Sequence, residues 1–330
     1  MAGGQERILR RRIKSIEATK KITRAMELIA GSRIVKAMAR VQAAKPYSEK
    51  VTTVISNLAS GGAGLDHPLL TEPTEVTKVA YVVVAADRGL CGGYNNNVLR
   101  AVERAIAADR AKGIGYELIL SGKKANGYFS FREFEVHSAL EGFSDQPTYA
   151  NAKQMAEVAT ELFESGEVQK VVLAYTQFLS VGTQVVSLAP FMPLDASDLG
   201  TDVDADEGAD VGVAGGYEFE PEPAEILGRL LPRYAEARLY AALLESSASE
   251  HAARQRAMKA ATDNAEDLKT NLTRVMNRAR QDSITTEIME IVSGSEALSQ
   301  DGKLISDDLL SDTIEGRESD LFHQHVQAEA

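Results

Sequence analysis

The sequence from Arg233 to Ser293 contains neither glycine nor proline. Glycine and proline are the residues least favourable inside a helix, so their absence predicts that this stretch is helical. At 1.5 Å per residue, a single helix over this stretch would be roughly 90 Å long. A small domain is not that deep, so such a helix must pack along another long helix or enter a partner protein.

The N-terminal segment is the other candidate for a long helix. Residues 5–45 contain one glycine, Gly31, and no proline, and Pro46 is expected to kink the helix before it ends at residues 60–62. Apolar residues at spacings of four and three are typical of a coiled coil. The N-terminal and C-terminal stretches both show this spacing, so we expect an antiparallel coiled coil with its core at Ile22, Ile29, Leu268, Leu272 and Val275.

The segment between the two predicted helices has a different pattern. Apolar runs at 79–85, 117–120, 170–175 and 184–191 are separated by amphipathic stretches at 96–111 and 150–164. Strands that alternate with helices favour an α/β domain with a mainly parallel sheet. The predicted organisation is a helix over 1–60, an α/β domain over 75–195, an acidic loop over 196–223, a helix over 224–298, and an acidic, mobile tail over 299–330.

The charge distribution and the cysteine content limit the kinds of protein to which this chain can belong. Residues 5–50 carry thirteen Lys/Arg against four Asp/Glu, although the net charge of the chain is −12. An electrostatic partner is therefore expected at the N-terminal helix. The single cysteine, Cys91, excludes an internal disulfide and fits a reducing compartment. No apolar run reaches the roughly 20 residues that a membrane-spanning helix needs.

The stretch VAYVVVAADRGLCGGYNNN, residues 79–97, has the outline of a phosphate-binding loop. It lacks the Lys-Ser or Lys-Thr of a Walker A loop, and Cys91 stands at the second glycine of the dinucleotide fingerprint. We therefore predict a tight turn before a helix that Asn95, Asn96 or Asn97 caps. A thiol nucleophile formed by Cys91 with His137 is the weaker reading.

We expect no catalytic residue, no cofactor and no metal site in this chain. An alternative is a nucleotide-dependent oxidoreductase that uses the α/β domain. A coiled coil that binds nucleic acid through its basic helix is disfavoured, because the whole chain is acidic and lacks an aromatic stacking platform.

Four stretches carry a resemblance to a known family. They are KKITRAMELIAGSRIVKA (20–37), DRGLCGGYNNNV (87–98), ALLESSASEHAARQRAMKAATDNAEDL (242–268) and ITTEIMEIVSGSEAL (284–298). In this order they resemble the gamma subunit of the F-type, proton-translocating ATP synthase. The acidic segment after residue 195 and the extension past Leu298 are departures from the usual pattern of that family.

The resemblance implies a central rotor shaft. Its terminal helices would form an antiparallel coiled coil inside a ring of three alpha and three beta subunits. Its Rossmann-like domain would be a foot near the c-subunit ring and the epsilon subunit, without a nucleotide, a nucleic-acid partner or a catalytic site. The complex would lie on the cytoplasmic face of the bacterial cell membrane, with this chain attached to it peripherally.

The resemblance also assigns residues that contact the alpha/beta ring. These are Met26, Arg254, Arg280, Gln281 and Thr285. The basic side chains of Lys20, Lys21 and Arg24, close to Met26, are expected to meet acidic groups of a beta subunit.

Overall fold

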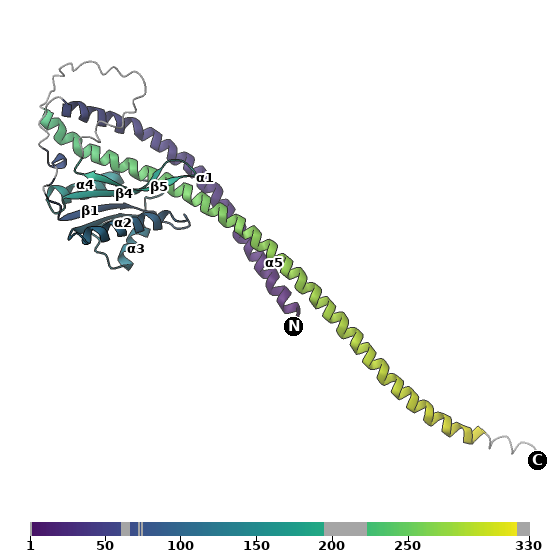
Figure 1. The fold of residues 1–330 in the computed structure, drawn as a ribbon. Coiled ribbons are helices and arrows are strands. Elements are labelled where there is room, and N and C mark those ends of the chain that lie inside the picture. Colours follow the sequence, from purple (N-terminus) through teal and green to yellow (C-terminus); the bar gives the residue numbers. More distant parts are fainter. Residues whose placement is uncertain (1, 61–66, 72, 74, 195–222, 322–330) are drawn as a thin grey trace, which may run out of the picture. The chain divides into compact units, whose positions relative to one another are not determined.

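The computed structural model describes residues 2–60, 67–71, 73, 75–194 and 223–321. Helix α1 (Ala2–Ser60) and helix α5 (Pro223–Leu321) lie at the two ends of the chain. The chain divides into two compact units: residues 21–262, and residues 1–20 together with residues 263–330. Both long helices contribute to each unit (Figure 1).

The larger unit contains a five-stranded sheet of β1 (Lys78–Val84), β2 (Gly115–Ser121), β3 (Ser138–Leu140), β4 (Lys170–Phe178) and β5 (Gln184–Met192). The strand order is β3-β2-β1-β4-β5, and only β5 pairs antiparallel, with β4. The prediction of an α/β fold with a mainly parallel sheet is confirmed. The sequence pattern missed β3, which has three residues, and the short helix α3 (Lys123–Phe131).

Helices cover both faces of this sheet. Helix α2 (Tyr94–Arg110) and α3 pack on one face, where Val79, Tyr81 and Val83 of β1 lie in their core. Helix α4 (Tyr149–Glu164), the 3-10 turn η1 (Pro68–Leu70) and α5 pack on the other. Because the central strand is buried on both sides, its sequence is a continuous apolar run rather than an alternating one.

Helices α1 and α5 run antiparallel within the larger unit. The hydroxyls of Thr23 and Thr262 are 2.8 Å apart, and a Cβ on Gly31 would lie 3.2 Å from Nε2 of Gln255. The buried positions of α1 along this contact include Ala30, Ile34 and Ala37. Small and polar side chains therefore form much of the seam and let the two helices approach closely.

The predicted core positions of α1 do not lie in this seam. Ile22 is 60% exposed and Ile29 is 54% exposed, so the prediction for both is wrong. The prediction followed the largest apolar side chains, whereas the buried stripe contains Thr23, Glu27 and Ala30. A four-three spacing defines a stripe, but it does not say which of two neighbouring stripes faces the partner helix.

The smaller unit has its own pairing of α1 with α5. Glu17 and Lys269 form an ion pair of 2.9 Å, and Lys20 pairs with Glu266. Leu9 and Ala265 are buried here, and the predicted core residue Leu272 is partly buried.

Two further core predictions fail on α5. Leu268 is 54% exposed and Val275 is 53% exposed. Because a straight helix drifts relative to a seven-residue repeat, the face that meets the partner moves away from a fixed stripe.

The C-terminal helix is longer than the sequence predicted. The sequence predicted a helix that ends at residue 298 and a mobile tail after it, but α5 continues through Gly302 to Leu321. That expectation is wrong because one glycine lowers helix stability without preventing a helix. The predicted acidic loop over 196–223 lies outside the described residues, apart from its last position, where α5 begins.

Gly122 provides a test of this fold. Its φ of +93° lies in a region that side-chain-bearing residues rarely adopt, and a Cβ there would overlap the carbonyl oxygen of Ala85. We predict that Gly122→Ala lowers the free energy of unfolding by more than about 3 kcal/mol, from strain and overlap together. The measurement is urea denaturation followed by circular dichroism.

The matched control is Gly127→Ala in the exposed part of α3, where a Cβ would meet nothing within 4 Å. It should be neutral or stabilising by up to about 1 kcal/mol, because alanine favours a helix over glycine. Equal stability of the two variants would contradict the described backbone at Gly122.

Candidate functional site

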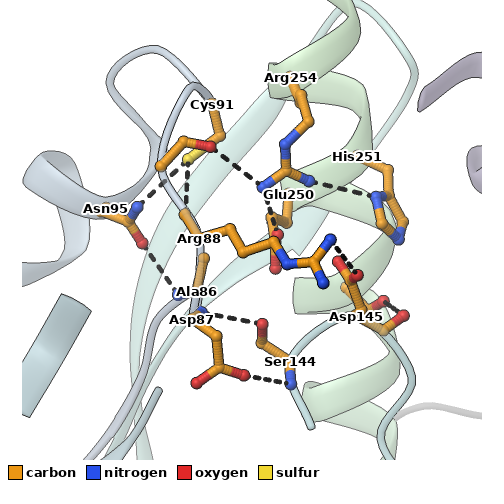
Figure 2. A network of polar contacts seen from close by, with 12 residues as sticks. Ala86, Asp87, Arg88, Cys91, Asn95, Ser144, Asp145, Glu250, His251 and Arg254 are labelled. Carbon is orange, nitrogen blue, oxygen red and sulfur yellow. Dashed lines mark hydrogen bonds and ion pairs between the residues drawn. The ribbon is translucent and has the colours of Figure 1, made fainter. Parts of the chain in front are cut away.

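The loop after β1, residues 85–93, meets α5 and the loop between β3 and α4 (Figure 2). It is the glycine-rich stretch that the sequence singled out. Leu90 has a φ of 62° and Gly92 a φ of 58°, so the backbone turns sharply here. The polar groups around this turn decide whether it can bind a ligand.

Asp87 supplies the cap that α3 lacks. Gly122 at the start of α3 has no side chain to accept a hydrogen bond, and Oδ1 of Asp87 accepts from the backbone N–H of Lys123 at 3.1 Å. The carboxylate also accepts from the N–H groups of Gly142 and Ser144, at 2.9 and 3.0 Å. Burial alone would raise the pKa of Asp87, but these N–H donors lower it below its usual value. The protein's own carboxylate thus occupies a position where a bound anion would be favoured.

Asn95 and Cys91 hold the turn closed. Oδ1 of Asn95 accepts from the N–H of Ala86 at 2.9 Å, and its Nδ2 lies 3.2 Å from Sγ of Cys91. Asn95 therefore does not cap α2, whose N-cap is Gly93. Burial raises the pKa of the Cys91 thiol, and His137 lies beside Glu117 instead. Cys91 is therefore a structural residue and not an activated nucleophile.

A hydrogen bond from Arg254 joins the turn to α5, and a buried ion pair within α5 holds that arginine. An Nη of Arg254 donates to Oε1 of Glu250 at 2.6 Å and to the carbonyl of Gly89 at 3.3 Å. Both side chains are buried, with 9% and 1% exposed. Burial raises the pKa of Glu250, and the guanidinium of Arg254 opposes that shift. Breaking a buried pair of this kind typically costs about 3–5 kcal/mol.

His251 lies against the same guanidinium. Nδ1 of His251 is 3.4 Å from an Nη of Arg254, and only a neutral imidazole can accept from a guanidinium. Burial is the main cause that lowers the pKa of His251 to about 4, Asp145 opposes it, and Arg254 assists it. His251 is therefore uncharged at neutral pH.

Asp145, in the loop between β3 and α4, contacts both α1 and α5 beside the glycine loop. Its Oδ2 accepts from Arg33 of α1 at 2.6 Å, and Arg88 of the glycine loop lies 3.7 Å away. Its backbone carbonyl accepts from the hydroxyl of Ser247 on α5 at 3.0 Å. One carboxylate thus connects α1 with the α/β domain.

A cavity of about 330 Å³ lies between the glycine loop, β5 and α5. Gly92, Gly93, Thr176 and Arg256 are among its lining residues, and none of the lining residues is acidic. A dinucleotide site normally uses a carboxylate to bind the ribose hydroxyls. The cavity therefore lacks the group that would support the oxidoreductase alternative.

Neither a metal site nor a membrane span is found in the part of the chain that the structure describes. Its histidine, cysteine, aspartate and glutamate side chains form no group of three or more that could hold a metal ion. Its helices include none that is both long and apolar enough to cross a membrane.

The predicted contact residues have different surroundings. Arg280, Gln281 and Thr285 on α5 are exposed, and Met26 on α1 is partly buried. Arg254 is buried by its contacts with Glu250 and the glycine loop, and its contact with the alpha/beta ring stays a prediction. Its spacing of four from Glu250 was a sequence signal for this pair, which the interpretation did not use.

The basic residues beside Met26 also have partners within the chain. Lys20 pairs with Glu266, and Arg24 pairs with Glu27 at 2.9 Å. Lys21 is exposed. Asp145 was missed altogether, because a single aspartate in a loop carries no pattern that predicts a distant arginine.

Comparisons with known proteins agree over most of the chain. The family described as ATP synthase matches residues 5–298. The chain is 48% identical over 299 residues to the ATP synthase gamma chain of Frankia casuarinae, covering 89% of this chain and 98% of that protein. It is 45% identical to the ATP synthase gamma chain of Kineococcus radiotolerans, covering 91% and 98%.

Solved structures show the same fold. The chain matches a chain of the Euglena gracilis mitochondrial ATP synthase, OSCP/F1/c-ring, with a TM-score of 0.61, 17% identity and coverage of 90% and 95%. A chain of the Tetrahymena thermophila mitochondrial ATP synthase central stalk/c-ring matches with a TM-score of 0.56, 24% identity and coverage of 73% and 99%.

The neutral state of His251 generates a pH prediction. The unfolded chain binds a proton at His251 near pH 6.5, but the folded chain binds one only near pH 4. Stability from this group is therefore present above pH 6.5 and is lost as the pH falls towards 4. Between pH 7 and pH 5 we expect a loss of roughly 2 kcal/mol that His251→Gln does not show. Urea denaturation at both pH values measures it, and parallel losses in the two proteins would refute the assignment.

Proposed function

This chain belongs to the family of ATP synthase gamma chains, and from that premise we propose that it is the central rotor shaft of an F-type ATP synthase. The observation that carries the proposal is the antiparallel pairing of the two chain ends, with an α/β domain fastened to both helices. In that role the chain couples proton-driven rotation of a c ring to conformational change in a ring of alpha and beta subunits.

The mechanism requires a shaft with unequal faces. Helix α1 exposes apolar side chains at Ile22, Leu28, Ile29 and Val35, while basic residues outnumber acidic ones over residues 5–50. Each of three beta subunits around such a shaft meets a different surface, and the subunit conformation that makes the better contacts is favoured. Rotation exchanges the surfaces, so each catalytic site changes its affinity for nucleotide in turn.

Residues 280–291 of α5 form the second proposed contact with the ring of alpha and beta subunits. Ile284, Ile288 and Ile291 are exposed on it, as are Arg280, Gln281 and Thr285. Exposed apolar residues in such number usually mark an interaction surface. We assign this surface to the ring of alpha and beta subunits, together with Met26 on α1.

We further propose that the chain is not catalytic by itself. Its glycine loop is occupied by its own polar groups, Asp87 at the start of α3 and Arg254 on Gly89. Catalysis then belongs to the alpha and beta subunits. The proposed location is peripheral, on the cytoplasmic face of a bacterial cell membrane, with the c ring and the epsilon subunit as the partners of the α/β domain.

The oxidoreductase alternative has a direct test. Isothermal titration of the purified chain with NAD, NADP and ATP should show no tight binding. A one-to-one complex with any of them would favour the alternative.

The contact surface on α5 generates a prediction. Arg280→Ala and Thr285→Ala should each reduce ATP hydrolysis by the reconstituted complex, because each removes a hydrogen-bonding group at the proposed contact. A hydrogen bond to a charged group is worth about 1.5–3 kcal/mol. Where the bond forms only in the slowest step of rotation, its removal should lower the rate of ATP hydrolysis at least tenfold. Thermal unfolding of the purified chain should be unchanged, since both side chains are exposed.

The matched control is Lys259→Ala, which removes an exposed basic side chain from the same helix outside the assigned contact. It should leave hydrolysis near the wild-type rate. Wild-type rates in both Arg280→Ala and Thr285→Ala would show that the contact is assigned wrongly.

A further inference from the structure

The loop between β3 and α4, residues 141–148, is where the α/β domain meets both long helices through polar contacts. Arg33 of α1 bonds to Asp145, and Arg40 of α1 lies 3.4 Å from the side-chain oxygen of Gln146. Ser247 of α5 donates to the carbonyl of Asp145. Figure 2 shows Asp145 beside Arg88, His251 and Glu250.

Elsewhere the domain meets the helices through an apolar core and through bonds from α5 alone, such as the one from Ser249 to the carbonyl of Thr176. Val51 and Ile55 of α1 and residues 227–243 of α5 share a core with α4 and the sheet. Apolar contact is non-directional, so it opposes separation of two surfaces more than it opposes their sliding. A hydrogen bond weakens steeply when its angle changes, so bonds across the same surface resist rotation.

We propose that Asp145 is a positioning residue that transmits torque between the α/β domain and α1 through its contact with Arg33. The inference rests on the proposed function, because torque passes through this surface only in a rotor. Under load, the c ring drives the α/β domain while the surrounding alpha and beta subunits hold α1. The Arg33–Asp145 bond keeps the two parts in one orientation.

The surroundings of Asp145 make this carboxylate the main link. Its Oδ1 is buried and has no hydrogen-bond partner among the described residues, so the carboxylate is held through Oδ2. Arg88 is 71% exposed and 3.7 Å distant, which makes it a weaker partner than Arg33 at 2.6 Å. A bond between ionised groups at this distance is among the stronger hydrogen bonds in proteins.

The test uses vesicles that carry the complete complex, assembled with wild-type or variant chain. ATP hydrolysis is measured without a proton gradient, and ATP-driven proton pumping is measured against an imposed gradient. We expect Asp145→Asn and Arg33→Gln to hydrolyse ATP at the wild-type rate without load. Against the gradient, each should pump about threefold less per ATP, the size expected for loss of a partly exposed ion pair.

Three control variants test whether the effect comes from the contact between Arg33 and Asp145 or from any loss of charge nearby. The combined Asp145→Asn/Arg33→Gln variant should be no worse than either single variant, because both remove the same contact. Arg40→Gln removes an equal charge from the same helix beside the same loop and should pump normally. Arg33→Lys, which keeps the charge, should recover part of the loss.

The outcomes distinguish this inference from the proposed function. If the wild-type chain does not restore coupled activity to the complex, the proposed function fails. If the wild type restores it and both single variants pump normally under load, only the torque role of Asp145 fails. If neither single variant assembles, Asp145 serves folding, and the torque role is likewise overturned.

Discussion

The antiparallel register of α1 on α5 determines where the α/β domain is inserted and how it meets both helices. Within residues 21–262 it is marked by the Thr23–Thr262 contact, and within the other unit by the Glu17–Lys269 ion pair. Alanine, glycine and threonine in the seam allow the helices to lie close together. Because one helix of the pair precedes and the other follows the rest of the described fold in the sequence, the α/β domain is inserted between two segments that pack on each other.

The glycine loop shows how a turn suited to phosphate can serve structure instead. Asp87, within the glycine loop, accepts a hydrogen bond at the start of α3, and Arg254 of α5 donates to the carbonyl of Gly89 in the same loop. Both groups are satisfied inside the protein, so the turn becomes the surface on which α5 rests. Glu250 is held by Arg254, which explains how a carboxylate with 1% of its side chain exposed can be tolerated. The domain and the helices are thereby fastened by directional bonds as well as by apolar area.

Periodic features of the sequence predicted the fold well, whereas features that depend on a distant residue could not be predicted. Long stretches with little or no glycine and proline predicted both long helices, and continuous apolar runs predicted the buried strands. The seam was misassigned because Ile22 and Ile29 look more like core than Thr23 and Ala30 do. The contact of Arg254 with Gly89 and that of Asp145 with Arg33 each join residues more than a hundred positions apart, and no local pattern in the sequence predicts them.

In a rotor shaft, the α/β domain and the helix pair turn as one body against the surrounding subunits. Phe131 is 88% exposed at the end of α3, and the single native cysteine, Cys91, is buried, so Phe131→Cys offers one site for a probe. With the ring of alpha and beta subunits fixed to a surface, ATP should drive that probe round in one direction, in three equal steps per turn. A probe that stays still while the complex hydrolyses ATP would show that this chain does not rotate.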